Sequence, residues 1–170
     1  MRRRLLSAAL PLFALLSAGC TSADPKATLA VSNVETYWAV QKQVGDQLYI
    51  AATIRFELRN TGPEPLDYLL ATATFKRKGF EQVDWGTAFE LVTPPGKALQ
   101  PGQSIVYHLQ SDTHYFSNGT PESMFDHPDF KDAFATLFLR VGPSPWVEFA
   151  KADVPRRIGS LAAAEAAATP

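Results

Sequence analysis

The chain of 170 residues contains a single cysteine, Cys20, so it holds no intramolecular disulfide. Its folded part therefore has to be stabilised by a hydrophobic core alone. A chain of this size buries about two thirds of the surface that its unfolded form exposes. We expect a core of ordinary globular size to be sufficient.

The chain also lacks an apolar run long enough to cross a bilayer. Its longest uncharged apolar run, residues 5–18, contains Pro11 and is shorter than the roughly 20 residues that a membrane-spanning helix needs. Three arginines, Arg2 to Arg4, precede this run. A basic start followed by a short apolar segment is typical of a secretory signal peptide.

Small residues stand just before the cysteine in "LLSAGC", and this pattern resembles the lipobox of bacterial lipoproteins. Ser17 stands where leucine is commonest in that family. The resemblance implies a signal peptide over residues 1–19, cleavage before Cys20, covalent lipid on Cys20 and a lipidated tether over residues 20–26. Thr21 resembles the signal for export to the outer membrane. The chain is then exported and membrane-anchored, facing the periplasm from the outer membrane if the cell is Gram-negative.

An excess of basic residues is absent as well. Loss of residues 1–19 removes three arginines and leaves 13 basic against 17 acidic side chains, a net charge of about −4. Proteins that bind nucleic acid present a basic face. The sequence therefore excludes nucleic acid from the expected partners.

Alternating apolar residues are the main structural signal in the rest of the chain. In "LYIAATIRFELRN", residues 48–60, apolar Ile50, Ile54, Phe56 and Leu58 alternate with more polar neighbours, a period of two that indicates a half-buried strand. Six further segments have strand composition: residues 28–41, 66–76, 85–92, 104–111, 134–142 and 146–154. About seven strands separated by Gly- and Pro-rich turns predict an all-β antiparallel sandwich.

Two turn motifs, "FELRNTG" and "LQPGQS", resemble bacterial envelope domains with an immunoglobulin-like fold, over residues 48–111. In those domains an N-x-G turn ends one strand and L-x-P-G-x-S begins a later one. The resemblance implies an immunoglobulin-like β-sandwich, which we place at residues 27–158. The alanine-rich residues 159–170 are too few to hold a helix alone in water, and we expect a disordered tail.

A long loop carrying short helical turns, residues 113–131, interrupts the regular strand pattern. Long loops on a rigid sandwich often carry function. Tyr115, Phe116, Met124 and Phe125 are the candidate binding residues of this loop, and the alternative is a lid whose apolar side chains close the end of the sandwich. Tyr115 and Phe116 are adjacent, so only one of them can face inward. Trp146 could also stack on sugar rings of the cell wall, but the alternating residues after it favour packing in the core or as a tyrosine-corner-like filler.

The same loop allows a metal-binding alternative. Imidazole and carboxylate groups of the kind that zinc or copper accepts are present at Asp112, His114, Asp126, His127 and Asp129. No H-x-H or H-x-x-x-H pair occurs, so a site would depend wholly on the tertiary fold. The other interpretation is that the histidines are solvated and the aspartates are caps.

Motifs for covalent catalysis are lacking: there is no G-x-S-x-G sequence, and the only cysteine is assigned to the lipid. We therefore predict a non-enzymatic protein without a cofactor other than its covalent lipid. The favoured function is that of a lipid-anchored envelope protein whose sandwich binds another envelope protein or a cell-wall polymer. The alternative is a metal-binding periplasmic lipoprotein that uses residues 112–129.

Overall fold

A computed structural model describes residues 24–159 of the chain. The predicted signal peptide, Cys20 and nearly all of the predicted tail lie outside the described residues, so their assignments stay predictions. Within residues 24–159, none of the helices has the length and apolar character to span a membrane.

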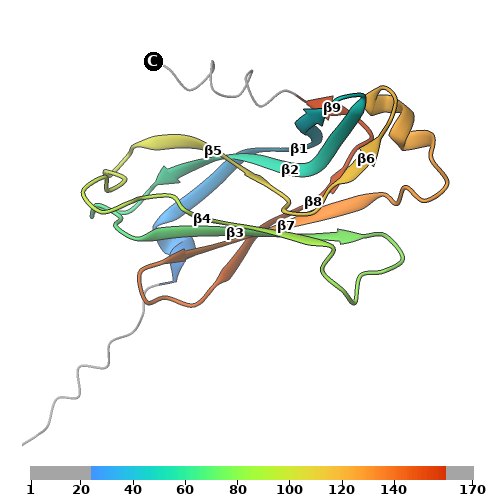
Figure 1. Cartoon of the computed structure of the whole chain (residues 1–170). Coiled ribbons are helices and arrows are strands. Elements are labelled where there is room, and N and C mark those ends of the chain that lie inside the picture. Colours follow the sequence, from blue (N-terminus) through green and yellow to red (C-terminus); the bar gives the residue numbers. More distant parts are fainter. Residues whose placement is uncertain (1–23, 160–170) are drawn as a thin grey trace, which may run out of the picture.

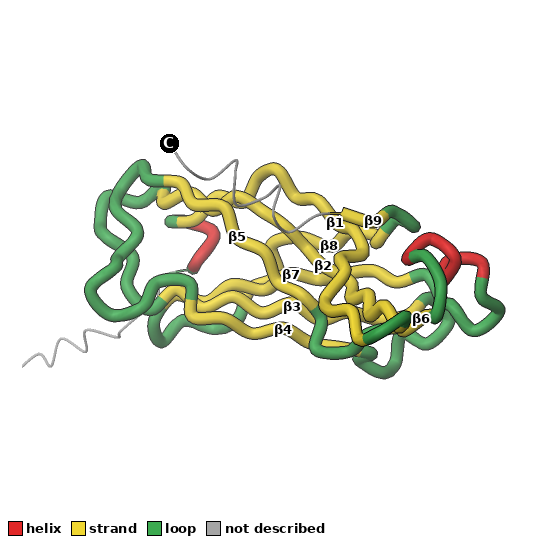
Figure 2. The backbone as a smooth tube through the Cα atoms, turned by 45° about the horizontal axis from the view of Figure 1, so that its top comes forward, coloured by secondary structure: helices red, strands yellow, loops and turns green. Residues whose placement is uncertain are grey.

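The described residues form an all-β sandwich of two layers, which confirms the predicted fold class (Figure 1). The strands are β1 (Leu29–Val44), β2 (Gln47–Asn60), β3 (Leu69–Arg77), β4 (Gly86–Leu91), β5 (Ser104–Gln110), β6 (Tyr115–Ser117), β7 (Ala133–Val141), β8 (Val147–Val154) and β9 (Ile158–Gly159). Two short 3₁₀ helices, η1 (Pro25–Ala27) and η2 (Pro121–Asp126), lie at opposite ends of the sandwich (Figure 2). All seven predicted strands are present, and β6 and β9 are additional.

One layer, which we call the five-stranded sheet, has the order β5-β2-β1-β9, with β6 pairing to β2 beyond the end of β5. The other, the four-stranded sheet, has the order β4-β3-β7-β8. Neighbouring strands are antiparallel except for β9, which runs parallel to β1. This division of strands between two layers is the immunoglobulin-like arrangement.

The period-two pattern of β2 places one set of side chains between the layers. Ile50, Ile54, Phe56 and Leu58 are at most 1% exposed, as the sequence predicts. Arg55 lies on the outer face of the same strand and is half-buried. Full burial of a Leu, Ile or Phe side chain contributes about 1.5–3 kcal/mol, so this strand contributes strongly to the core.

The two turn motifs meet at one end of the sandwich. Asn60 is fully buried, and its side-chain amide donates to the carbonyl oxygens of Leu99 and Glu64, both at 2.8 Å. Its side-chain oxygen accepts from the Gly62 N–H at 2.9 Å. The asparagine thus satisfies backbone groups of both turns, which explains why the motifs occur together.

The ends of the sandwich differ in what they carry. The tether end holds η1, Asn60 and the start of β1, and the described chain begins there at Asp24. The lid end holds the β1–β2 turn, β6 and η2. β1 runs from one end to the other, and its 16 residues extend over about 50 Å.

Candidate functional site

The predicted loop 113–131 begins as an edge strand. β6 pairs with β2 through Leu48↔Ser117, Tyr49↔Phe116 and Ile50↔Tyr115, where β2 extends past the end of β5. Tyr115 points inward with Ile50, and Phe116 points outward and is 59% exposed. The expectation that only one of this pair faces inward is confirmed.

An aromatic cluster fills the lid end beneath this loop. Tyr115 stacks on Trp85 with ring centroids 5.0 Å apart, and the Trp38 ring lies 5.7 Å from Tyr115. Phe130 lies 4.9 Å from Tyr115 and 5.1 Å from Trp38. Such pairs each contribute about 0.5–1.5 kcal/mol beyond their buried area, so the loop is tied to the core through its aromatic residues.

Helix η2 covers the cluster from outside. Thr120 caps the helix, accepting from the Ser123 N–H at 3.3 Å, and both Met124 and Phe125 are at most 8% exposed. The guanidinium of Arg156 holds η2 in place by donating to the Phe125 carbonyl at 2.8 Å. Three of the four candidate binding residues are therefore packed as a lid, and Phe116 alone among them is exposed.

The candidate metal ligands are not brought together. His127 Nδ1 lies 3.9 Å from the Asp129 carboxylate and accepts the Asp129 N–H at 3.2 Å. His114 packs edge-on against Tyr49, and the Asp112 carboxylate accepts from the Thr87 N–H at 2.8 Å. Among residues 24–159, no group of three His, Cys, Asp or Glu side chains has the arrangement of a metal site.

The outer face of the four-stranded sheet carries exposed aromatic residues instead. Phe89 on β4 is 60% exposed, and Trp146, just before β8, is 37% exposed. Their rings meet edge-to-face, 6.1 Å between centroids, although two strands separate β4 from β8. Arg140 of β7 lies over Trp146 at 5.0 Å. The prediction that Trp146 belongs to the core is wrong, because its ring lies against Phe89 and Arg140 on the outer face of the four-stranded sheet.

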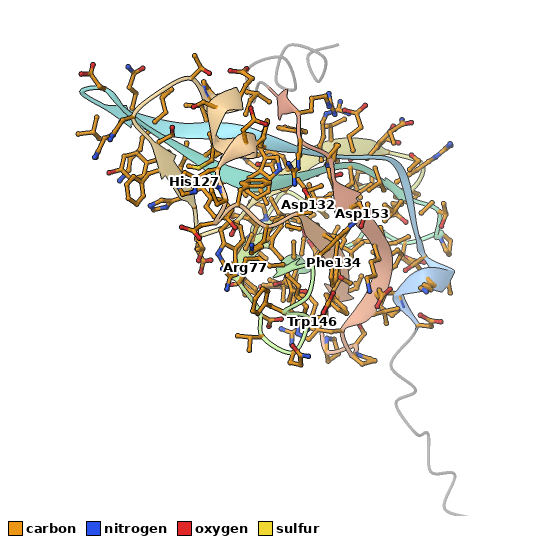
Figure 3. The ribbon with its side chains drawn as sticks, turned by 90° about the vertical axis from the view of Figure 1, so that its right-hand side faces the viewer. Arg77, His127, Asp132, Phe134, Trp146 and Asp153 are labelled. Carbon is orange, nitrogen blue, oxygen red and sulfur yellow. The ribbon has the colours of Figure 1, made fainter. Side chains whose placement is uncertain are left out.

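A shallow hollow of about 740 Å³ lies on the same face, toward the lid end. Its floor runs along β7 through Phe138, Thr136 and Phe134, and its walls carry three lysines and four carboxylates. Lys151 covers the Phe134 ring at 4.3 Å, and Phe134 and Asp153 lie close together in Figure 3. His127, in the lid, lies well apart from Trp146 in that view.

Two ion pairs shape the walls of the hollow. Lys76 Nζ lies 3.3 Å from the Asp84 carboxylate, and Lys78 Nζ donates to Asp153 at 2.7 Å. The hydrogen bond from Lys78 to Asp153 raises the pKa of Lys78 above its usual value. Lys78 therefore stays charged at neutral pH, and the hollow offers hydrogen-bond donors and acceptors side by side.

Sequence reasoning missed Phe89. The strand "WGTAFELV" suggests burial of its largest apolar residues, but Gly86 and Ala88 face inward and Phe89 faces out. A Cβ on Gly86 would overlap the Ser111 side chain, so this inward position has no room for a side chain. The alternation of the small residues Gly86 and Ala88 with the larger Thr87 and Phe89 is the sequence signal that could have placed Phe89 on the outer face.

Comparison with known proteins finds no matching family model and no matching curated protein. Three solved structures share a similar arrangement over about three quarters of this chain. A structural-genomics target, SoR45, is 10% identical, has a TM-score of 0.40 and is covered over 86% of its length. The putative ApaA protein from Bordetella pertussis is 20% identical, with a TM-score of 0.37 and 91% coverage of that chain.

The third is a Bacteroides uniformis β-glucuronidase, 17% identical with a TM-score of 0.41. The match covers 74% of this chain but only 12% of that enzyme. At these TM-scores and identities, none of the three carries an argument about function.

Proposed function

We propose that this chain is a lipid-anchored, non-enzymatic protein of the cell envelope that binds a surface polymer through the outer face of its four-stranded sheet. The observation that carries the proposal is the Phe89–Trp146 pair, whose exposed rings meet across the sheet. An outer sheet face without a ligand normally carries polar residues. Exposed aromatic rings beside a polar hollow suit a ligand with apolar faces and polar edges.

The charge of the hollow favours an uncharged polymer. Its three lysines are balanced by four carboxylates, so a strongly anionic polymer would meet no excess of positive charge. Thr74 and Thr136 face each other across β3 and β7 in the middle of the hollow and add hydroxyl groups. A polysaccharide of the cell wall has both the hydroxyl edges and the apolar ring faces that such a surface recognises.

The anchor supports the same function. The resemblance of "LLSAGC" to a lipobox places the lipid on Cys20, a few residues before Asp24 at the tether end. Seven residues of tether extend over about 25 Å at most. The domain therefore works near the membrane surface, where cell-wall polymer is within reach.

Co-sedimentation with insoluble cell-wall polysaccharide tests the proposal, using the full chain extracted in mild detergent. We expect Phe89→Ala and Trp146→Ala each to weaken binding by about tenfold, the loss of one stacking contact. Phe116→Ala is the matched control, because Phe116 is 59% exposed and Phe89 is 60% exposed. Equal binding by all three variants would refute the site. If the wild-type chain does not bind the polymer but crosslinks to an envelope protein, the ligand is a protein and the proposed polymer is wrong.

A further inference from the structure

Strand β5 is an edge of the five-stranded sheet, and within residues 24–159 it pairs with β2 alone. Just past its C-terminal end, the Ser111 N–H donates to the Ala52 carbonyl of β2 at 2.9 Å. Just before its N-terminal end, the Gln103 carbonyl accepts from the Asn60 N–H of β2 at 3.0 Å. Backbone groups alternate in direction along an antiparallel strand, so odd-numbered residues bond to β2 and even-numbered residues point away. The residues whose N–H and C=O groups point away are Ser104, Val106, His108 and Gln110.

This edge lacks the devices that usually protect an edge strand. The sequence of β5, "SIVYHLQ", contains no lysine, arginine, acidic residue, proline or glycine. Such residues, a bulge or a very short strand normally keep a further strand from pairing. Among the other described edges, β8 has a register shift and carries Glu148, Lys151 and Asp153, and β9 has only two residues. On β4, the Thr87 backbone is already bonded to Asp112. β5 is therefore the edge best suited to accept a further strand.

A cleft of about 520 Å³ lies between β5 and β4, the neighbouring edge of the other sheet. Toward the lid end it is closed by Asp112, whose N–H donates to the Thr87 carbonyl at 3.0 Å. His108 and Gln110 line the cleft from β5. Gln110 Nε2 is buried and has no hydrogen-bond partner among the described residues. A buried donor without a partner is costly, so an acceptor brought by a ligand would stabilise the bound state.

The charged groups of this cleft are acidic. Its carboxylates belong to Glu90 and Asp112, and among the described residues no lysine or arginine lines it. Burial and, to a lesser extent, the charge of Glu90 raise the pKa of Tyr107, which faces the other sheet, so Glu90 lies near the inner face of β5. Arg55 and Arg59 are in register with β5 but face the outer side of the sheet. A segment with basic side chains complements this cleft, whereas a second copy of β5 brings no lysine or arginine.

We propose that β5 accepts an extended segment of a partner protein as an additional edge strand, with lysine or arginine side chains of that segment facing Glu90. The seven residues of β5 extend over about 23 Å, so the segment needs about seven residues to pair along the whole edge. Main-chain hydrogen bonds to the even-numbered residues supply affinity, and Glu90 supplies the preference for a basic residue. This inference does not depend on the proposed polymer site, which lies on the outer face of the four-stranded sheet.

Fluorescence anisotropy with a labelled, terminally blocked peptide tests the predicted charge. The probe has the sequence "TVKVKVT", and its matched control, "TVEVEVT", carries glutamate in place of both lysines. We expect the full chain, extracted in mild detergent, to bind the lysine peptide about tenfold or more tightly than the glutamate peptide. Glu90→Gln should remove most of this preference. Equal binding of both peptides by the wild type would overturn the basic partner.

Backbone methylation tests the strand pairing on the wild-type chain. In an extended peptide the valine N–H groups point to one side and the lysine N–H groups to the other. One lysine peptide is therefore N-methylated at its valines and another at its lysines. We expect one of the two to lose binding and the other to keep it, because only one side of an added strand bonds to β5. If both keep the affinity of the unmethylated peptide, the added strand is refuted.

His108→Pro tests the edge from the side of the protein. The His108 N–H points away from β2, so proline there removes a donor of the open edge and none of the β2–β5 ladder. We expect this variant to bind the lysine peptide about tenfold or more weakly, while the matched control His108→Ala keeps wild-type affinity. Circular dichroism checks that both variants keep their β-sheet. Concentration-dependent dimers of the wild type that His108→Pro abolishes would assign the edge to a second copy of the chain and overturn the partner.

Discussion

Arg156 and Asp132 form a two-point ion pair at the lid end. Arg156 Nε donates to one carboxylate oxygen at 2.7 Å, and Nη2 donates to the other at 3.3 Å. The same guanidinium reaches the Phe125 carbonyl and lies over the Phe130 ring at 5.3 Å. One side chain thus joins the segment between β8 and β9 to η2 and to the segment that leads from η2 into β7.

This pair predicts a pH dependence of stability. The hydrogen bond from Arg156 holds the pKa of Asp132 below its usual value. A carboxyl group with a lowered pKa in the folded state stabilises fully above its unfolded pKa, about 4, and loses this as pH falls through the folded pKa. Both side chains are nearly half exposed, so solvent screening limits the effect to about 1 kcal/mol or less.

Urea unfolding of the wild type and of Asp132→Asn between pH 7 and pH 3 measures this effect. The difference in unfolding free energy should be present at pH 7 and shrink toward zero at the acid end. Asp129→Asn is the control, because the Asp129 side chain is 92% exposed and lies 3.9 Å from His127 without a short ion pair. A difference for Asp132→Asn that stays constant over this range would contradict the assignment.

The lid itself is expected to contribute to stability. Phe125→Ala removes a ring that is 8% exposed and packs on Phe130 at 5.3 Å, so we expect a loss of about 3–5 kcal/mol. Phe116→Ala removes an exposed ring of the same loop and should change stability by less than about 0.5 kcal/mol. Similar losses for both variants in chemical denaturation would mean that the loop does not form a lid.

The register of β2 makes a separate prediction. Ile54 is fully buried, so Ile54→Ala should cost about 2–5 kcal/mol of unfolding free energy. Its neighbour Arg55 lies on the other face and is half-buried, and Arg55→Ala should cost much less. Thermal or urea unfolding of the two variants in parallel decides the point, and equal losses would mean that the inward face is misassigned.

Lipidation of Cys20 is a prediction from the sequence alone. Cells supplied with a clickable palmitate analogue should label the wild-type protein and leave Cys20→Ala unlabelled, and only the wild type should fractionate with membranes. Labelling of both proteins to the same extent would refute the predicted lipid anchor and the membrane localisation that follows from it. The polymer-binding assay in detergent stays informative in either case.

Sequence alone identified the strands that follow a simple rule. The inward face of β2 follows the period-two pattern, and the turns around Asn60 and Leu99 have the residue types that their hydrogen bonds require. The sequence predicts a loop where β6 lies, because its three residues pair with the part of β2 that extends beyond the end of β5. That pairing depends on the relative lengths of strands far apart in the sequence, which a local pattern does not contain. A period-two pattern also indicates which residues share a face of the strand, but not which face lies inside. Phe89 is an example, because it is a large apolar residue that lies on the outer face.

The long strand β1 has a mechanical consequence for the proposed anchor at Cys20. Tension on such a tether would enter the domain at the start of β1, and the component along the strand axis would load its ladder with β2. Hydrogen bonds between antiparallel strands lie perpendicular to that axis, so the β1–β2 ladder carries the load in shear, with all its bonds strained together. Under the proposed anchor and polymer, this arrangement would favour a domain that stays folded under tension.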